Sequence, residues 1–366
     1  AKDAGFNMIR PWRKPPPPMW LDLCDEIGMM VVGGLPIECM NHWPTVTPML
    51  RERVFSEVRS AVMRDRNRAC IVQWEMFNEI HRPGLKRLKH PASMLARSLD
   101  PTRLILDESG GFASGANIYL PYQNEPEKFN DVHTYPGAPV NDVAYDKFLA
   151  LSKTQSEIEA LKLRAKSSVR SGTTPGLMTV VSEVGYGSLP DLVANNTRFA
   201  KDGNPLVPPY RYHKMLAESF RAALKDSGLD VVYPDLQQFC LDQQTMHAEA
   251  NKRMVEAARM NPDVDGYAVH ALTGGDWVLG AGLLDLFRNP KKVYWTMKEV
   301  NQERYLALRI LPRNVYAAKG TTISISGINE LDDVEGRLSM EVFSAQGEAV
   351  FEKTIEAVLG KGIHPL

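Results

Sequence analysis

Short apolar or β-branched runs alternate with longer amphipathic stretches along residues 1–302, and this alternation limits the fold more than any other feature. Runs of about four to eight apolar residues fit buried strands, whereas apolar stripes at helical spacing fit helices that cover a sheet. Strands are expected at 6–10, 29–35, 71–77, 103–106, 131–135, 177–182 and 266–270. Helices are expected at 20–27, 48–66, 92–98, 145–164, 212–225, 241–259 and 293–301. This order predicts repeated β/α units around a parallel sheet.

The repeated units add up to an incomplete barrel. Seven β/α units are visible, one fewer than a TIM barrel contains. The chain begins at Ala1 without Met, and its start resembles the last turn of a helix closed by Gly5, so we expect the first unit to lie upstream. A doubly wound sheet is the alternative, but no Gly-rich phosphate loop follows any of the strand runs. We therefore predict a (β/α)8 TIM barrel lacking its first β/α unit, over residues 1–302.

The pattern changes after Arg304. Four runs alternate like antiparallel strands and are separated by turn signals, at 305–311, 321–326, 338–343 and 349–354. Four such strands cannot close a sandwich. Residues 303–366 are therefore predicted to form part of an all-β, immunoglobulin-like sandwich.

Charge, hydropathy and cysteine spacing argue against several kinds of binding partner. The formal net charge is −1, which gives no electrostatic basis for binding nucleic acid or a membrane surface. No apolar stretch approaches the roughly 20 residues that span a bilayer. The four cysteines show no Cys-x-x-Cys spacing, so no metal site is expected, and we expect no organic cofactor. The compartment and the oligomeric state stay open.

Two glutamates stand where apolar strand runs end. Glu79 follows the run at 71–77 and is preceded by Asn78, and Glu183 closes the run at 177–182. A carboxylate at such a place is costly to bury without a partner or a task. Either glutamate alone fits a structural salt bridge equally well. The pair indicates hydrolysis of a glycosidic bond, because that reaction needs two carboxyl groups flanking the anomeric carbon and a TIM barrel presents its active site at the strand ends.

Three groups of motifs occur in a fixed order. The first is Gly-Phe-Asn-Met-Ile-Arg at 5–10 with Leu-Asp-Leu-Cys-Asp-Glu-Ile-Gly at 21–28. The second is Arg-Asp-Arg-Asn-Arg at 64–68, then Ile-Val-Gln-Trp at 71–74 and Asn-Glu at 78–79. The third is Gly-Leu-Leu-Asp at 282–285 with Arg-Asn-Pro-Lys at 288–291. Together they resemble the second β/α unit, the acid/base signature and the stretch after the eighth strand of glycoside hydrolase family 2, which groups β-galactosidases, β-glucuronidases and β-mannosidases.

The resemblance covers roughly residues 1–302 and implies a retaining β-glycosidase. It makes the visible strands numbers two to eight, with Glu79 on the fourth and Glu183 on the seventh. Glu79 is then the acid/base and starts the reaction protonated, whereas Glu183 is the ionised nucleophile that forms a covalent glycosyl-enzyme. Asn78 is placed to hydrogen-bond a sugar 2-hydroxyl group.

Other side chains complete the expected site. Arg10 ends the second strand and can keep Glu183 ionised, and Tyr135 can donate a hydrogen bond to the same carboxylate. His133 fits a sugar contact and a buried core histidine equally well. Beyond the last strand, Asp276 can bind a hydroxyl group and Trp277 can offer a ring face to the sugar.

Sugar specificity stays open. The loop at 11–15 departs from the Ser-His-Tyr-Pro of many relatives, and no Asn-x-Lys motif of the glucuronidase type follows Glu183. We predict an exo-acting, β-galactosidase-like enzyme whose substrate is a terminal β-linked sugar. The alternatives are a β-mannosidase or another specificity in the same family, and a non-catalytic carbohydrate-binding barrel.

Overall fold

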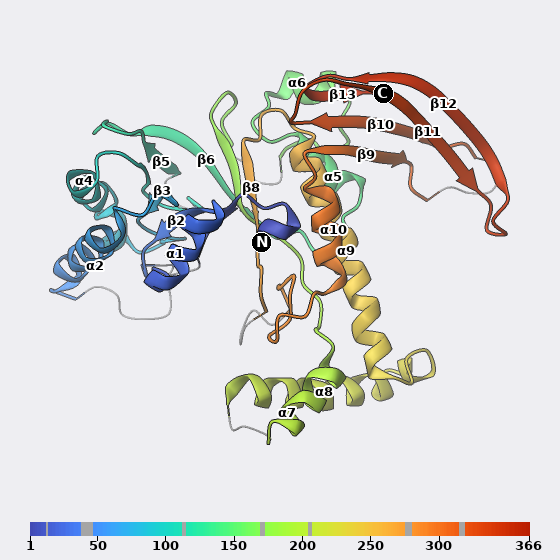
Figure 1. Cartoon of the computed structure of the whole chain (residues 1–366), viewed down its shortest axis with the longest axis horizontal. Coiled ribbons are helices and arrows are strands. Elements are labelled where there is room, and N and C mark those ends of the chain that lie inside the picture. Colours follow the sequence, from blue (N-terminus) through green and yellow to red (C-terminus); the bar gives the residue numbers. More distant parts are fainter. Residues whose placement is uncertain are drawn as a thin grey trace.

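An eight-stranded sheet forms the centre of the computed structural model, which describes residues 1–11, 14–37, 47–111, 115–168, 173–203, 207–274, 280–314 and 319–366. Its strands lie in sequence order from β1 to β8 (Figure 1). They are β1 (Met8–Ile9), β2 (Met30–Gly34), β3 (Ile71–Glu75), β4 (Leu104–Leu106), β5 (Ala116–Tyr119), β6 (Glu127–Thr134), β7 (Thr179–Val184) and β8 (Gly266–Val269). All neighbouring pairs are parallel except the two that involve β5.

The sheet curves around an interior cavity of about 650 Å³, to which all eight strands contribute lining residues. Strands β1 and β8 stand at the two ends of the strand order. A curved, largely parallel sheet with helices outside it is a TIM barrel, so this part of the fold prediction is confirmed. The antiparallel strand β5 was not expected. It is short, and it lies between β4 and the first half of β6.

The helices lie outside the sheet, and most of them cover the barrel. They are η1 (Lys2–Ala4), α1 (Pro18–Ile27), α2 (Leu50–Asp65), α3 (Pro83–Lys86), α4 (Lys89–Leu99), α5 (Asp142–Leu149), α6 (Gln155–Ala160), α7 (Leu192–Lys201), α8 (Pro208–Asp226), η2 (Leu229–Val231), α9 (Leu236–Arg259) and α10 (Lys292–Val300). One apolar core lies between β2, β3 and helices α1, α2 and α4, and another lies between β7, α5 and α9. Of the helices in the described ranges, none has the length and apolar character that crossing a membrane requires.

The single helix expected at 145–164 is wrong. The structure has two helices there, because Ser152 adopts a φ of 60° and Thr154 starts a new helix. The Thr154 hydroxyl accepts from the backbone N–H of Glu157, whose carboxylate accepts from the Thr154 backbone. This reciprocal capping box is a strong helix start. It outweighs the apolar periodicity that runs across both helices.

The segment between β7 and β8 forms a helical lobe. Helices α7, α8 and the first half of α9 project away from the barrel (Figure 1). They enclose a small apolar core of their own, which contains Leu192, Ala217, Leu224, Leu236 and Cys240. The second half of α9 returns along the barrel and packs against α5 and α10.

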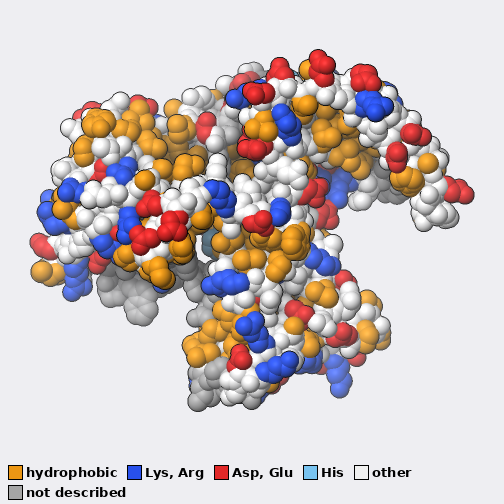
Figure 2. All heavy atoms as spheres, in the orientation of Figure 1, with side chains coloured by type: hydrophobic (Ala, Val, Ile, Leu, Met, Phe, Trp, Pro, Cys, Tyr) orange, Lys and Arg blue, Asp and Glu red, His pale blue; other side chains and the backbone are white. Residues whose placement is uncertain are grey.

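Antiparallel strands follow α10. Strands β9 (Arg304–Leu311), β10 (Thr322–Asn329) and β13 (Gly362–Pro365) form one sheet, and β11 (Val334–Phe343) pairs with β12 (Ala349–Leu359) in a second. This agrees with the predicted β-domain, while the boundary at 302/303 stays a prediction. Figure 2 shows Lys and Arg side chains interspersed with Asp and Glu over the visible face, as expected for a net charge of −1.

Candidate active site

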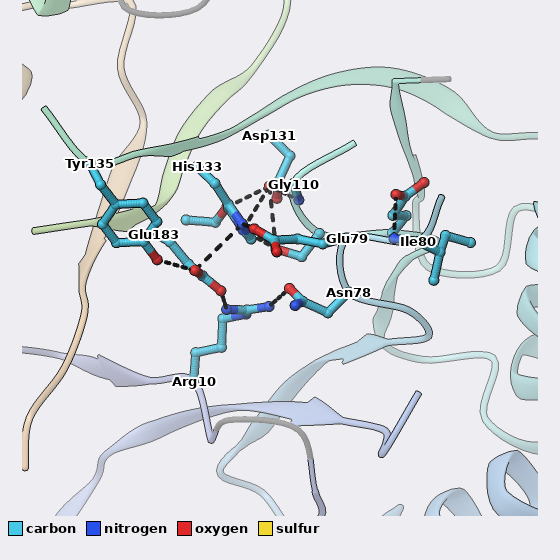
Figure 3. Close-up of polar contacts among 12 residues, drawn as sticks. Arg10, Asn78, Glu79, Ile80, Gly110, Asp131, His133, Tyr135 and Glu183 are labelled. Atoms are coloured by element: carbon cyan, nitrogen blue, oxygen red, sulfur yellow. Dashed lines mark hydrogen bonds and ion pairs between the residues drawn. The ribbon is translucent and has the colours of Figure 1, made fainter. Parts of the chain in front are cut away.

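Four polar residues from three strands meet at the carboxyl ends of β1, β3 and β7. Arg10 follows β1, Asn78 and Glu79 follow β3, and Glu183 lies at the end of β7. Parallel strands bring their carboxyl ends to the same edge of a barrel, so residues far apart in sequence become neighbours. Figure 3 shows the side chains of these residues converging on Glu183 and Glu79.

Arg10 connects three of the strand ends. Its Nε and Nη2 donate to the two carboxylate oxygens of Glu75, each at 2.6 Å. Its Nη1 donates to Glu183 at 2.6 Å and its Nη2 to the Asn78 side-chain oxygen at 2.8 Å. Burial lowers the pKa of Arg10, but the carboxylates of Glu75 and Glu183 outweigh burial and raise it overall. The guanidinium therefore stays charged and fixes the position of Glu183.

Glu183 is held as a carboxylate. Its Oε1 accepts from Arg10, and its Oε2 accepts a short hydrogen bond from the Tyr135 hydroxyl. Burial alone raises the pKa of this carboxyl group, but His133, Arg10 and the Tyr135 hydroxyl together bring the pKa below its ordinary value. An ionised carboxylate that points into a strand-end cluster can act as a nucleophile.

Glu79 occupies an unusual backbone position. Its φ is 49°, in the left-handed region that residues other than glycine rarely adopt. The backbone is fixed there because the Glu79 N–H donates to the Ser109 carbonyl at 2.9 Å and the Asn78 N–H donates to the Ile37 carbonyl at 3.0 Å. Strained residues of this kind cluster at functional sites. The strain turns the Glu79 side chain towards His133, whose Nδ1 lies 2.5 Å from Glu79 Oε1.

A second layer of polar groups holds His133. Its Nε2 lies 2.9 Å from the Ser109 hydroxyl, which donates to Asp131 Oδ1 at 3.3 Å. The same Asp131 oxygen accepts from the Gly110 N–H at 2.6 Å and from the Ser182 hydroxyl at 2.5 Å. All of these groups are buried. The Asp131 carboxylate is thus fixed by three hydrogen-bond donors, next to the ring of His133.

Comparison with known proteins places this barrel in a family. Residues 1–160 match the model of the glycosyl hydrolases family 2 TIM barrel domain. This part of the chain therefore matches the barrel of glycoside hydrolase family 2. Among curated relatives, a putative β-glucuronidase of Formosa agariphila is 34% identical over 115 residues, covering 30% of this chain and 10% of that protein. A β-galactosidase of Vibrio cholerae is 29% identical over 119 residues, covering 31% of this chain and 11% of that protein.

Solved structures give the same fold. A β-D-mannosidase from Dictyoglomus thermophilum superposes with a TM-score of 0.63 at 18% identity, covering 100% of this chain and 42% of that one. Identity this low carries the fold alone. The matched segments span only about a tenth of the curated relatives, so the activity of the whole family 2 protein is a matter for proposal.

The family 2 site also contains a set of atoms that could bind a metal ion. One carboxylate oxygen each from Glu79 and Glu183 and one ring nitrogen of His133 lie within 4.8 Å of one another. One nitrogen and two oxygen donors suit Zn²⁺ or a similar ion. The Arg10 guanidinium beside Glu183 opposes a further cation there. The expectation that the protein uses no metal and no organic cofactor stays a prediction.

A buried polar cluster joins the two loops beside this site, those after β7 and β8. The Lys291 ammonium donates to the carbonyl of Ser188 at 3.0 Å and to the carbonyl of Gly280 at 2.7 Å. His247 on α9 contacts the Ser188 hydroxyl through Nδ1 at 3.0 Å, while its Nε2 has no hydrogen-bond partner in the described ranges. Burial, helped by the Lys291 charge, lowers the pKa of His247 to about 2.

This cluster should make the protein lose stability in mild acid. The unfolded chain protonates His247 below its ordinary pKa of about 6.5, whereas the folded protein does not until near pH 2. The unfolded state therefore binds the extra proton, and the free energy of unfolding from this residue falls by about 2 kcal/mol between pH 7 and pH 5. Denaturant titrations at pH 7 and pH 5 should show that the free energy of unfolding falls less in His247→Gln than in the wild type. An unchanged fall contradicts the prediction, and His364→Gln in β13 serves as the matched control.

The backbone strain at Glu79 also has a measurable consequence. Glycine adopts a positive φ without penalty, so Glu79→Gly should be more stable than Glu79→Ala by about 1 kcal/mol, although both lack the carboxylate. The same pair at Glu341 in strand β11 should show the opposite order, because glycine weakens an ordinary strand. Chemical unfolding of the four variants gives the comparison. Equal or greater stability of Glu79→Ala contradicts the account of strain.

The structure brings most of the expected residues together. Arg10, Asn78, Glu79, Tyr135 and Glu183 lie in one hydrogen-bonded cluster, with His133 among them. His133 directs its ring at Glu79 and its side chain is 1% exposed, which favours the core position over the sugar contact. Asp276 and Trp277 lie outside the described residues, so their expected contacts with sugar stay predictions.

Sequence reasoning missed Glu75 and Asp131. Glu75 lies inside β3 and forms the bidentate pair with Arg10, and Asp131 supports His133. Glu75 is a charged residue in the mostly apolar run at 71–77, and this was the signal that could have found it. Asp131 lies in a strand with many polar residues, so it carries no such signal. Burial raises the pKa of Glu75, and the Arg10 guanidinium opposes that shift.

Proposed function

We propose that this family 2 barrel hydrolyses terminal β-linked sugars with net retention of anomeric configuration. Glu79 serves as the general acid and then the general base, and Glu183 as the nucleophile. The observation that carries the proposal is the closeness of the two carboxyl groups, one oxygen of each lying within 4.8 Å of the other. Carboxyl groups about 5–5.5 Å apart suit direct attack on the sugar, whereas inverting enzymes need about 6.5–9.5 Å to seat a water molecule.

The electrostatics support different roles for the two carboxyl groups. Arg10 and Tyr135 hold Glu183 ionised, as a nucleophile requires. Glu79 contacts neither group through a described hydrogen bond and faces His133 instead. In the first step Glu183 forms a bond to the anomeric carbon while the Glu79 proton passes to the departing oxygen. In the second step Glu79 takes a proton from water, which releases the sugar from Glu183.

The remaining residues would position the sugar. Asn78 projects beside the two glutamates, where its amide can reach the sugar 2-hydroxyl, and Arg10 orients it by donating to its oxygen. Asp276 and Trp277 are proposed to bind the outer hydroxyl groups and one face of the ring. The donor sugar is proposed to be β-galactose, which is supported by the curated β-galactosidase that the barrel resembles.

A panel of nitrophenyl β-glycosides tests the proposal on the purified protein. We expect hydrolysis of the β-galactoside to exceed that of the β-mannoside, the β-glucoside and the β-glucuronide. Proton NMR of the reaction should show the β-anomer of the free sugar before mutarotation. Faster hydrolysis of the β-mannoside would favour the β-mannosidase alternative. An α-anomer as the first product would contradict retention. No turnover of any β-glycoside, with sugar binding intact, would favour the non-catalytic carbohydrate-binding barrel.

A further inference from the structure

His133 is placed to control the proton on Glu79. Its ring lies between two carboxylates from different strands, Glu79 on one side and Asp131 on the other (Figure 3). Nδ1 is 2.5 Å from Glu79 Oε1, and Nε2 is 3.7 Å from Asp131 Oδ1, with the Ser109 hydroxyl at 2.9 Å from the same nitrogen. Histidine mediates such contacts because its two ring nitrogens can hold one proton or two.

The hydrogen bonds on the Ser109 side assign the proton on Nε2. The Ser109 hydroxyl donates to Asp131, so its oxygen is left to accept from the histidine. Asp131 is fixed in turn by the Gly110 N–H and the Ser182 hydroxyl. An ionised carboxylate next to the ring also favours a proton on the nitrogen that faces it. Nε2 of His133 therefore carries a hydrogen whatever the state of Nδ1.

The contact at Nδ1 then requires a shared proton. Two lone pairs 2.5 Å apart would repel, so one proton must lie between Nδ1 and Glu79 Oε1. That proton sits either on Glu79, with a neutral ring accepting from it, or on His133, with an ionised Glu79 accepting. Both arrangements keep one transferable proton on the pair. It is the proton that the departing oxygen needs in the first step.

We infer that His133 is a positioning residue that holds the acid proton on Glu79, a role that rests on the proposed function. The proton leaves the pair for the departing oxygen as the glycosidic C–O bond breaks and Glu183 bonds to the anomeric carbon. His133 then keeps its Nε2 hydrogen, and its Nδ1 lone pair repels the ionised Glu79, which favours the return of a proton to the pair. When water attacks, the proton that it gives up returns to the same pair.

The dependence on the leaving group tests this role. A phenyl β-glycoside needs the acid proton, because phenolate is a poor leaving group, whereas a 2,4-dinitrophenyl β-glycoside departs without it. General acid catalysis is worth about 10²–10⁴-fold. In His133→Asn and His133→Phe we expect kcat/KM on the phenyl glycoside to fall by about 10²-fold. On the dinitrophenyl glycoside, kcat/KM should stay within about threefold.

One further variant and two contrary outcomes make the test decisive. Ser109→Ala removes the hydroxyl that contacts both Nε2 of His133 and Asp131, and it should show the same selectivity to a smaller degree. It keeps the test open if a His133 variant fails to fold. An equal fall on both substrates, or no fall, overturns the role of His133 while leaving the proposed function standing. A wild-type protein that cleaves neither substrate overturns the proposed function and this inference with it.

Discussion

Replacing Glu183 with alanine should lower kcat by about 10⁴-fold or more, because the reaction would lose the group that forms the covalent intermediate. The fold should persist, since Arg10 keeps its bidentate partner Glu75 and remains neutralised. Steady-state kinetics on the best substrate of the nitrophenyl panel measure the loss, and a binding titration with the free sugar checks that the site is intact. A loss smaller than about tenfold would contradict the assignment.

The matched variant Glu79→Ala separates the two roles. Small anions such as azide can enter the space that a removed carboxylate leaves. In Glu183→Ala azide would attack the face opposite the leaving group and give an α-glycosyl azide. In Glu79→Ala the covalent intermediate still forms, azide attacks from the other face, and the product is a β-glycosyl azide. The same anomer from both variants would mean that the two glutamates do not flank the anomeric carbon.

Replacing Arg10 with methionine should be the most destabilising single change in the site. Glu75 would remain buried without the guanidinium that donates to both of its oxygens. Removing one partner of a buried ion pair costs about 3–5 kcal/mol, because the other charge is left without compensation. Urea unfolding at pH 7 measures this cost. A loss below about 1 kcal/mol would show that the pair does not hold the strand ends together.

A double variant separates the effect of Arg10 on stability from its effect on catalysis. Arg10→Met with Glu75→Gln removes both charges and should recover most of the lost stability. It should not recover activity, because Glu183 would still lack the cation that lowers its pKa. On acidification, kcat/KM should then begin to fall at a higher pH than in the wild type, because a nucleophile with a higher pKa is protonated at a higher pH. Full recovery of activity would contradict the role given to Arg10.

The order of the barrel strands could be predicted because each is a short apolar run between turn signals. The expected run at 71–77 differs from β3 only at its end, where the chain leaves the sheet to place Asn78 and Glu79. Strand β5 escaped prediction because the four residues Ala116–Tyr119 are too few to show the alternation of a strand. Its antiparallel pairing with β4 and β6 is visible only in the folded sheet. Helix α7 also escaped prediction, because its apolar residues pack mainly against the other helices of the lobe.

The sequence predicts the site residues that follow or end apolar strand runs, because these positions meet at one edge of a TIM barrel. Glu79 and Glu183 end apolar runs, so the sequence places them at one edge of the barrel. The bonds of Arg10 to Glu75 and of His133 to Glu79 were not visible, because they depend on side chains from different strands meeting across the barrel. Sequence spacing gives the strand on which a residue lies. It does not give the direction of a side chain, which the positive φ of Glu79 sets here.

The most direct test of the two-carboxylate mechanism is to trap the covalent intermediate. A 2,4-dinitrophenyl 2-deoxy-2-fluoro-β-glycoside of the preferred sugar reacts readily in the first step, because its leaving group is good. Fluorine at C2 destabilises the positively charged transition states, so the second step becomes slow and the glycosyl-enzyme accumulates. Mass spectrometry of the digested protein should find the fluorosugar on Glu183. A stable adduct on another residue, or none while the enzyme still hydrolyses the normal substrate, would contradict the account.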